Sequence, residues 1–123
     1  MARILLVEDN EMNRDMLLRR LSRNGHEVLI AVDGEQAVAA AVSEKPEIVL
    51  MDVGLPGIDG YEATRRIRAG EATRHLPVIA LTAHAMSGER ERALDAGCDD
   101  FDTKPVDIQR LLGKIEALLA RRG

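Results

Sequence analysis

Acidic, hydroxyl and basic side chains follow directly on short strand-like runs in this chain of 123 residues. Glu8 and Asp9 follow the first run, Asp52 follows a later one, and Thr82 and Lys104 follow two more. If these runs are neighbouring strands, three carboxylates meet in one place and repel one another unless a cation neutralises them. An all-oxygen site of this kind suits Mg²⁺. Lys104 and the Thr82 hydroxyl have a use there if an anion such as a phosphoryl group also binds.

Asp52 is the candidate nucleophile of such a site. A carboxylate can attack phosphorus to give an aspartyl phosphate, and Asp52 ends a buried-type apolar run and is followed by the small residue Gly54. Backbone N–H groups after Asp52 and Thr82 could bind the phosphoryl oxygens. A metal would screen the attacking and leaving oxygens during the transfer.

Five strand-like runs alternate with amphipathic stretches along the chain. They span residues 4–7, 28–32, 48–51, 78–81 and 101–103, and the last is polar enough to be a sheet edge. This alternation predicts an α/β fold, a doubly wound parallel sheet of five strands with five helices on its two faces. For such a sheet we take the flavodoxin-like strand order 2-1-3-4-5. The strand order reverses between the first and third strands. Asp9 and Asp52 should therefore face each other on the rim formed by the carboxyl ends of the strands.

Capping residues and apolar stripes define the helices between these strands. Four residues are predicted N-caps: Asn10, Asp33, Ser87 and Asp107. A third helix is predicted from residue 61 to residue 69. The apolar stripe of the first helix is predicted to be buried: Met12, Met16, Leu17 and Leu21. The second helix is predicted to bury a similar stripe: Ala37, Val38, Ala41 and Val42.

Composition limits the class of protein. The length fits one domain over residues 1–123 with no effector domain. A net charge of −4 with 17 scattered Lys and Arg residues argues against direct nucleic-acid binding. Cys98 has no partner for an internal disulfide and is expected to be a small buried hydrophobe. The first apolar run is too short for a signal peptide or membrane insertion, so the cytoplasm is the expected location.

Four segments of the sequence together resemble the receiver domains of two-component response regulators, the CheY-like superfamily, in order and spacing. They are Val7–Asn10, Met51–Gly60, Ala80–Ala83 and Phe101–Pro105. The residues after the first strand and those that begin at Thr82 show a narrower similarity. They resemble stand-alone cell-cycle regulators of the DivK type and receivers of hybrid histidine kinases.

The resemblance assigns a role to each residue on the rim. It implies that Asp52 is the phosphoacceptor and that Mg²⁺ is bound by Asp9, Asp52 and the carbonyl of Gly54, with Glu8 helping through water. It implies that Thr82 and Lys104 bind the phosphoryl group. Two further residues complete the pattern: Phe101 is the switch aromatic that responds to Thr82, and Pro105 follows a cis peptide bond.

The resemblance also implies a signalling role. The chain would accept a phosphoryl group from a histidine kinase or a histidine phosphotransfer protein and would regulate partner proteins through a change of surface. It would catalyse only its own phosphorylation and slow dephosphorylation. The output face of the family consists of the fourth helix, fifth strand and fifth helix. On this chain that face should include Arg90, Arg92, Asp102 and Arg110.

Three other functions compete with this one. A phosphohydrolase of the haloacid-dehalogenase type also uses an aspartate nucleophile, but it needs a second aspartate where Gly54 stands. A flavodoxin-like cofactor module needs N–H donors after its first strand, where Glu8 and Asp9 would repel a phosphate. A receiver that serves as an unphosphorylated scaffold is the third.

Three positions bear on how this chain compares with the family pattern. Gly54 and His84 occupy the positions that tune hydrolysis of the phosphoryl group in the family, and Asp102 replaces an apolar residue of the fifth strand.

Overall fold

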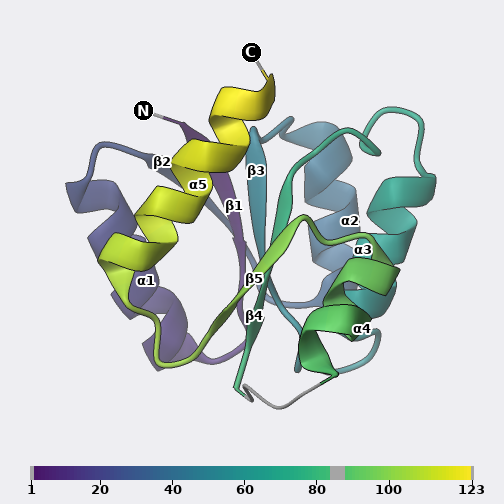
Figure 1. Ribbon diagram of the computed structural model, residues 1–123, viewed down its shortest axis with the longest axis horizontal. Helices are drawn as coiled ribbons and strands as arrows, with labels where there is room; N and C mark the ends of the chain where they lie inside the picture. Colours follow the sequence, from purple (N-terminus) through teal and green to yellow (C-terminus); the bar gives the residue numbers. More distant parts are fainter. Residues whose placement is uncertain (1, 84–87, 123) are drawn as a thin grey trace.

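The computed structural model describes residues 2–83 and 88–122 and contains one parallel sheet (Figure 1). Its strands are β1 (Arg3–Val7), β2 (Glu27–Ala31), β3 (Ile48–Asp52), β4 (Val78–Thr82) and β5 (Asp100–Thr103). They lie in the order β2-β1-β3-β4-β5, which confirms the predicted topology and places β5 at an edge. The helices are α1 (Glu11–Arg23), α2 (Gly34–Ser43), α3 (Gly60–Ala69), α4 (Glu89–Ala96) and α5 (Ile108–Arg122).

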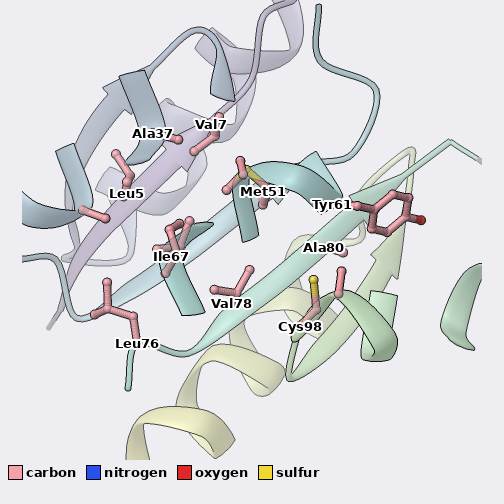
Figure 2. Close-up of a cluster of buried hydrophobic side chains, with 14 of the residues drawn as sticks. Leu5, Val7, Ala37, Met51, Tyr61, Ile67, Leu76, Val78, Ala80 and Cys98 are labelled. Atoms are coloured by element: carbon pink, nitrogen blue, oxygen red, sulfur yellow. The ribbon is translucent and has the colours of Figure 1, made fainter. Parts of the chain in front are cut away.

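Helices cover both faces of the sheet, with α1 and α5 on one face and α2, α3 and α4 on the other (Figure 1). The central strands β1, β3 and β4 are largely apolar runs because alternate residues enter two different cores. Leu5 and Met51 point into the core beneath α2, α3 and α4, which Figure 2 shows. Ile4 and Leu50 lie in the core beneath α1 and α5. The central strands are therefore held rigidly from both sides, and their carboxyl ends are fixed in space.

Side-chain caps begin four of the helices. The carboxyl or amide oxygens of three predicted caps accept backbone N–H groups: Asn10 from Asn13, Asp33 from Gln36, and Asp107 from Gln109 and Arg110. Asp59 caps α3 in the same way, so that helix begins one residue earlier than predicted. Ser87 lies outside the described residues, and α4 begins after Gly88 with no side-chain cap.

The predicted burial of three apolar residues is wrong. Met12 is 80% exposed, Met16 37% and Val42 53%. Met12 and Met16 form one stripe of α1, whereas Leu17 and Leu21 form another that is rotated by about 100°. Only one of these stripes can face the sheet, and the structure buries Leu17 and Leu21. The burial of Cys98 was predicted correctly.

A polar link joins α3 to α4. The Tyr61 hydroxyl donates a hydrogen bond to the Glu89 carboxylate, and the Arg92 guanidinium lies 4.8 Å from the centroid of the Tyr61 ring. The ring itself is buried in the core next to Cys98 and Ala80 (Figure 2). This link anchors the first turn of α4, which follows the segment after Thr82.

A Tyr61→Phe variant is expected to lose about 1–2 kcal/mol of unfolding free energy near neutral pH, because a hydrogen bond to a charged acceptor disappears. Burial, reinforced by Glu89, raises the pKa of Tyr61. The folded protein therefore keeps the phenol proton above about pH 10, where the unfolded chain loses it, and this part of the stability falls as the pH rises. Urea unfolding at about pH 8 and about pH 11 should show the gap between wild type and variant narrowing at high pH. A gap that is constant or widens would contradict the role given to the phenol.

No helix among the described residues is both long and apolar enough to cross a membrane.

Candidate functional site

The carboxyl ends of four strands bring the predicted site residues to one rim of the sheet. Asp52 is the last residue of β3 and Thr82 the last residue of β4. Glu8 and Asp9 follow β1 directly, and Lys104 follows β5. Because β1 lies next to β3, the reversal of strand order falls between Asp9 and Asp52, as expected from the sequence.

Three carboxylates form an acidic cluster on this rim. One oxygen from each of Glu8, Asp9 and Asp52 lies within 4.8 Å of the others. Asp9 is exposed, Asp52 is almost entirely buried, and Glu8 has no exposed surface. Closely spaced carboxylate oxygens, two of them shielded from water, are a suitable donor set for a hard divalent cation.

Lys104 is the cation that the chain itself places in this cluster. Its Nζ lies 2.9 Å from Oε1 of Glu8 and 3.1 Å from Oδ2 of Asp52. The Glu8–Lys104 pair was not predicted, because 96 positions separate the two residues and neither has a local signal for the other. Lys104 is therefore an internal counter-ion as well as a candidate ligand for an incoming anion.

The charged groups in the cluster shift the pKa values of Glu8 and Lys104. Burial and the neighbouring Asp52 raise the pKa of Glu8, while hydrogen bonds from Lys104 and the Asn10 N–H act in the opposite direction. Burial works to lower the pKa of Lys104, but its hydrogen bonds to Glu8 and Asp52 outweigh this and raise it. Lys104 is consequently charged over the whole physiological range and can attract an anionic group.

Backbone contacts fix Asp52 in place. Its Oδ1 accepts a hydrogen bond of 3.0 Å from the N–H of Gly54. The first residue of α3, Gly60, packs against the backbone of Asp52 and Val53 so closely that it has no room for a side chain. Gly60 therefore sets the distance between α3 and the end of β3.

The two residues expected to contact a phosphoryl group are joined through the backbone. The N–H of Lys104 donates a hydrogen bond of 2.8 Å to the carbonyl of Thr82. The Thr82 side chain is buried, and the Lys104–Pro105 peptide bond is cis. A shift in the end of β4 would be transmitted directly to the lysine.

A groove of about 280 Å³ opens beside Lys104. Its walls come from the end of β1, from α1 and from the segment between β5 and α5: Glu8, Asn13, Met16, Leu17, Lys104, Pro105 and Val106. The walls are largely apolar and the acidic cluster adjoins them. A partner that reaches the rim from this side would contact apolar side chains before it meets Lys104.

One prediction about the edge strand β5, the exposure of Asp102, is wrong. Asp102 was predicted on an exposed face, but its side chain is 2% exposed. It faces α5, where Arg110 covers it with a hydrogen bond of 2.9 Å from Nε to Oδ1. The carboxylate is tolerated at this normally apolar position because it has a cation within reach. Arg90, Arg92 and Arg110 themselves are exposed.

Phe101, which the sequence predicts as the switch aromatic, is half-buried against the core beneath α4. The ammonium group of Lys114 lies 5.5 Å from the centroid of its ring and also donates a hydrogen bond to the Phe101 carbonyl. Phe101 therefore packs on the α4 side of the sheet, and the Lys114 side chain reaches it from α5.

Comparisons with known proteins agree with this geometry. The family model described as the response regulator receiver domain matches residues 4–116. The response regulator PleD of Caulobacter vibrioides is 40% identical over 117 residues, which are 95% of this chain and 26% of PleD. The polar-differentiation response regulator DivK of Brucella ovis is 35% identical over 116 residues, 94% of each chain. The chain thus spans only part of PleD but nearly all of DivK.

Solved structures show the same fold. The receiver domain of a sensor histidine kinase from Pseudomonas aeruginosa is 42% identical, with a TM-score of 0.90 and coverage of 97% of this chain and 98% of that one. That structure has a magnesium ion coordinated in its active-site cleft. A putative response regulator from Chloroflexus aurantiacus is 34% identical, with a TM-score of 0.93 and the same coverage.

Proposed function

Because the chain belongs to the response regulator receiver domain family, we propose that Asp52 is its phosphoacceptor and that phosphorylation there controls which proteins it binds. Members of this family are phosphorylation-controlled regulators of two-component systems rather than classical enzymes. The observation that carries the proposal is the position of the Asp52 carboxylate. It is buried at the end of β3 with Lys104 Nζ 3.1 Å from Oδ2, beside two further carboxylates.

The proposed metal is Mg²⁺, and its proposed ligands are Asp9, Asp52 and the carbonyl of Gly54. The donor set supports this, since carboxylate and carbonyl oxygens with water suit a small hard cation. When bound, the cation neutralises charge on the attacking and leaving oxygens during phosphoryl transfer. The family resemblance gives Glu8 a water-mediated part in metal binding.

The chemistry that the chain performs is a transfer onto Asp52. A carboxylate oxygen forms a new bond to phosphorus while the bond from phosphorus to the donor nitrogen or acyl oxygen breaks, and the donor leaves with the bonding electrons. Lys104 and the Thr82 hydroxyl bind the phosphoryl oxygens and compensate their charge. Catalysis by the chain is restricted to this step and to slow hydrolysis of the product.

The proposed donor is a histidine kinase or a histidine phosphotransfer protein, which would reach Asp52 beside the groove between α1 and the β5–α5 segment. The proposed output face is formed by α4, β5 and α5, with Arg90, Arg92 and Arg110 exposed on it. Movement of Thr82 toward the phosphoryl group and reorientation of Phe101 would couple phosphorylation of Asp52 to the output face. Such a change biases an equilibrium between two conformations that exist beforehand.

Incubation with acetyl phosphate tests the proposal. The wild-type protein is expected to gain the mass of one phosphoryl group in the presence of Mg²⁺ and none in the presence of EDTA, because the carboxylates repel the donor when no cation neutralises them. Intact-protein mass spectrometry and peptide mapping measure the gain and its position. A protein that neither takes up phosphate nor responds to beryllofluoride would instead be a binding module with a constant surface.

A further inference from the structure

We propose that Arg14 is a positioning residue for Asp9, the exposed carboxylate of the proposed Mg²⁺ site. This inference rests on the proposed function and concerns how the site is arranged before a cation binds. Asp52 lies at the end of β3, where the Gly54 N–H fixes its carboxylate. Asp9 lies outside the sheet, on the segment between β1 and α1, and needs a different support.

Three consecutive carbonyls of this segment accept hydrogen bonds from one residue, Arg14. Its guanidinium Nη1 donates to the carbonyl of Glu8 at 3.1 Å and to that of Asp9 at 3.4 Å. Its backbone N–H donates to the carbonyl of Asn10 at 2.9 Å. Among the described residues no backbone N–H donates to the first two carbonyls, so neither the sheet nor the helix satisfies them. Arg14 therefore fixes the path of the chain from β1 into α1.

The geometry of α1 directs the Arg14 side chain to this segment. Side chains of an α-helix lean toward its amino end, so a residue in the first turn lies over the segment that precedes the helix. Arg14 is the fourth residue of α1, and its side chain is half-buried. Two carboxylates are close to it in the sequence, Glu11 and Asp15, yet within residues 2–83 and 88–122 Arg14 pairs with no carboxylate. The guanidinium thus holds backbone carbonyls instead of neutralising a neighbouring charge.

The carboxylate of Asp9 depends on this backbone for its position. The Asp9 side chain is exposed, and no donor in the part of the chain that the structure describes contacts its carboxylate. One of its oxygens nevertheless lies within 4.8 Å of oxygens of Glu8 and Asp52. Like charges at this separation repel one another, so an unsupported Asp9 would move away from the cluster. The hydrogen bonds from Arg14 to the backbone on both sides of the Asp9 side chain oppose that movement.

A guanidinium near a cation site has two opposite effects on Mg²⁺ affinity. Its positive charge repels the cation, but Arg14 is partly exposed, and water and salt screen such a repulsion strongly. Its hydrogen bonds hold a ligand in place, and residues that support a metal ligand from behind contribute about tenfold to a hundredfold in affinity. The second effect is the larger. The sign of the change in affinity when Arg14 is removed therefore distinguishes positioning from simple charge repulsion.

Calorimetric titration of the full chain with Mg²⁺ tests the proposal with three variants: Arg14→Met, Arg14→Lys and Arg19→Met. The first removes the donors and the charge, and the second keeps the charge without the planar guanidinium. Arg19→Met is the matched control, because Arg19 is an exposed arginine of the same helix and makes no polar contact with the described residues. Thermal unfolding checks that each variant is folded, and Arg14→Lys carries the test if Arg14→Met does not fold.

Arg14→Met is expected to raise the Kd for Mg²⁺ about tenfold, although it removes a positive charge from the neighbourhood of the site. Arg14→Lys should raise it about threefold, and Arg19→Met should change it by less than about twofold. In labelling by acetyl phosphate, the Mg²⁺ concentration for half-maximal rate should rise with the Kd, while the rate at saturating Mg²⁺ stays within about twofold of wild type. General damage to the fold would lower the maximal rate as well.

A Kd of Arg14→Met that equals or falls below the wild-type value would overturn the inference, because the guanidinium would then act through its charge alone. Backbone ¹⁵N relaxation of the metal-free protein gives an independent result. The order parameters of Asp9 and Asn10 should be about 0.85 in the wild type and fall toward about 0.6 in Arg14→Met, and unchanged values would refute the inference.

Failure of the inference and failure of the proposed function give different results. Calorimetry and relaxation are carried out without a phosphodonor, so they test the role of Arg14 even if Asp52 takes up no phosphate. A wild-type protein that binds no Mg²⁺ would refute the proposed metal site and this inference together. A wild-type protein that binds Mg²⁺ as tightly as Arg14→Met does would refute the inference alone.

Discussion

An Asp52→Asn variant is expected to gain no phosphoryl group from acetyl phosphate at any Mg²⁺ concentration. The amide has the shape of the carboxylate but lacks the negative oxygen that attacks phosphorus. The fold should persist, because the asparagine side chain can still accept the Gly54 N–H and Lys104 retains its bond to Glu8. Intact-protein mass spectrometry over a time course measures the loss, which should be complete within detection.

Asp33→Asn is the matched control for this variant. Asp33 caps α2 through a hydrogen bond of 2.8 Å from the Gln36 N–H, and asparagine caps helices equally well. The control removes one carboxylate that lies outside the acidic cluster and should be labelled at the wild-type rate. Persistent labelling of Asp52→Asn on another residue would overturn the assignment of the phosphoacceptor.

A Gly60→Ala variant is expected to damage both the fold and the site. A Cβ at position 60 would meet the Asp52 carbonyl oxygen and come within 2.7 Å of Val53 Cα. These are backbone atoms, so α3 or the end of β3 must move, at a cost of about 1–3 kcal/mol of unfolding free energy. A displacement of about 1 Å at a reacting group can also slow its reaction on the order of a hundredfold. Urea unfolding and labelling by acetyl phosphate measure the two effects.

Gly113→Ala provides the contrast. Gly113 lies inside α5, and a Cβ there would meet nothing within 4 Å. Alanine in place of glycine within a helix should raise the unfolding free energy by about 0.5–1 kcal/mol and leave labelling unchanged. If Gly60→Ala behaved like Gly113→Ala, close packing of α3 on the end of β3 would not be what positions Asp52.

Local patterns were sufficient to identify most strands and helices and their alternation. Uninterrupted apolar runs and the capping residues Asn10, Asp33 and Asp107 are signals within a few positions of the chain, and they marked the strands and the starts of three helices. Regular alternation of strands and helices then leaves few arrangements, because crossovers between parallel strands are right-handed. Burial was wrongly predicted for Met12, Met16 and Val42. These errors concern which of two neighbouring stripes of a helix packs against the sheet. That choice depends on how the whole helix is rotated against its neighbours.

The sequence by itself determined the rim on which the site lies, because the carboxyl ends of parallel strands all lie on the same rim of the sheet. Asp52, Asp9, Thr82 and Lys104 could be placed there from the positions where their strands end. The tertiary structure alone decided which charges pair: Lys104 with Glu8 across 96 positions, and Arg110 with a buried Asp102. The physical reason is that ion pairing acts through a few ångströms of space and leaves no periodic trace along the chain.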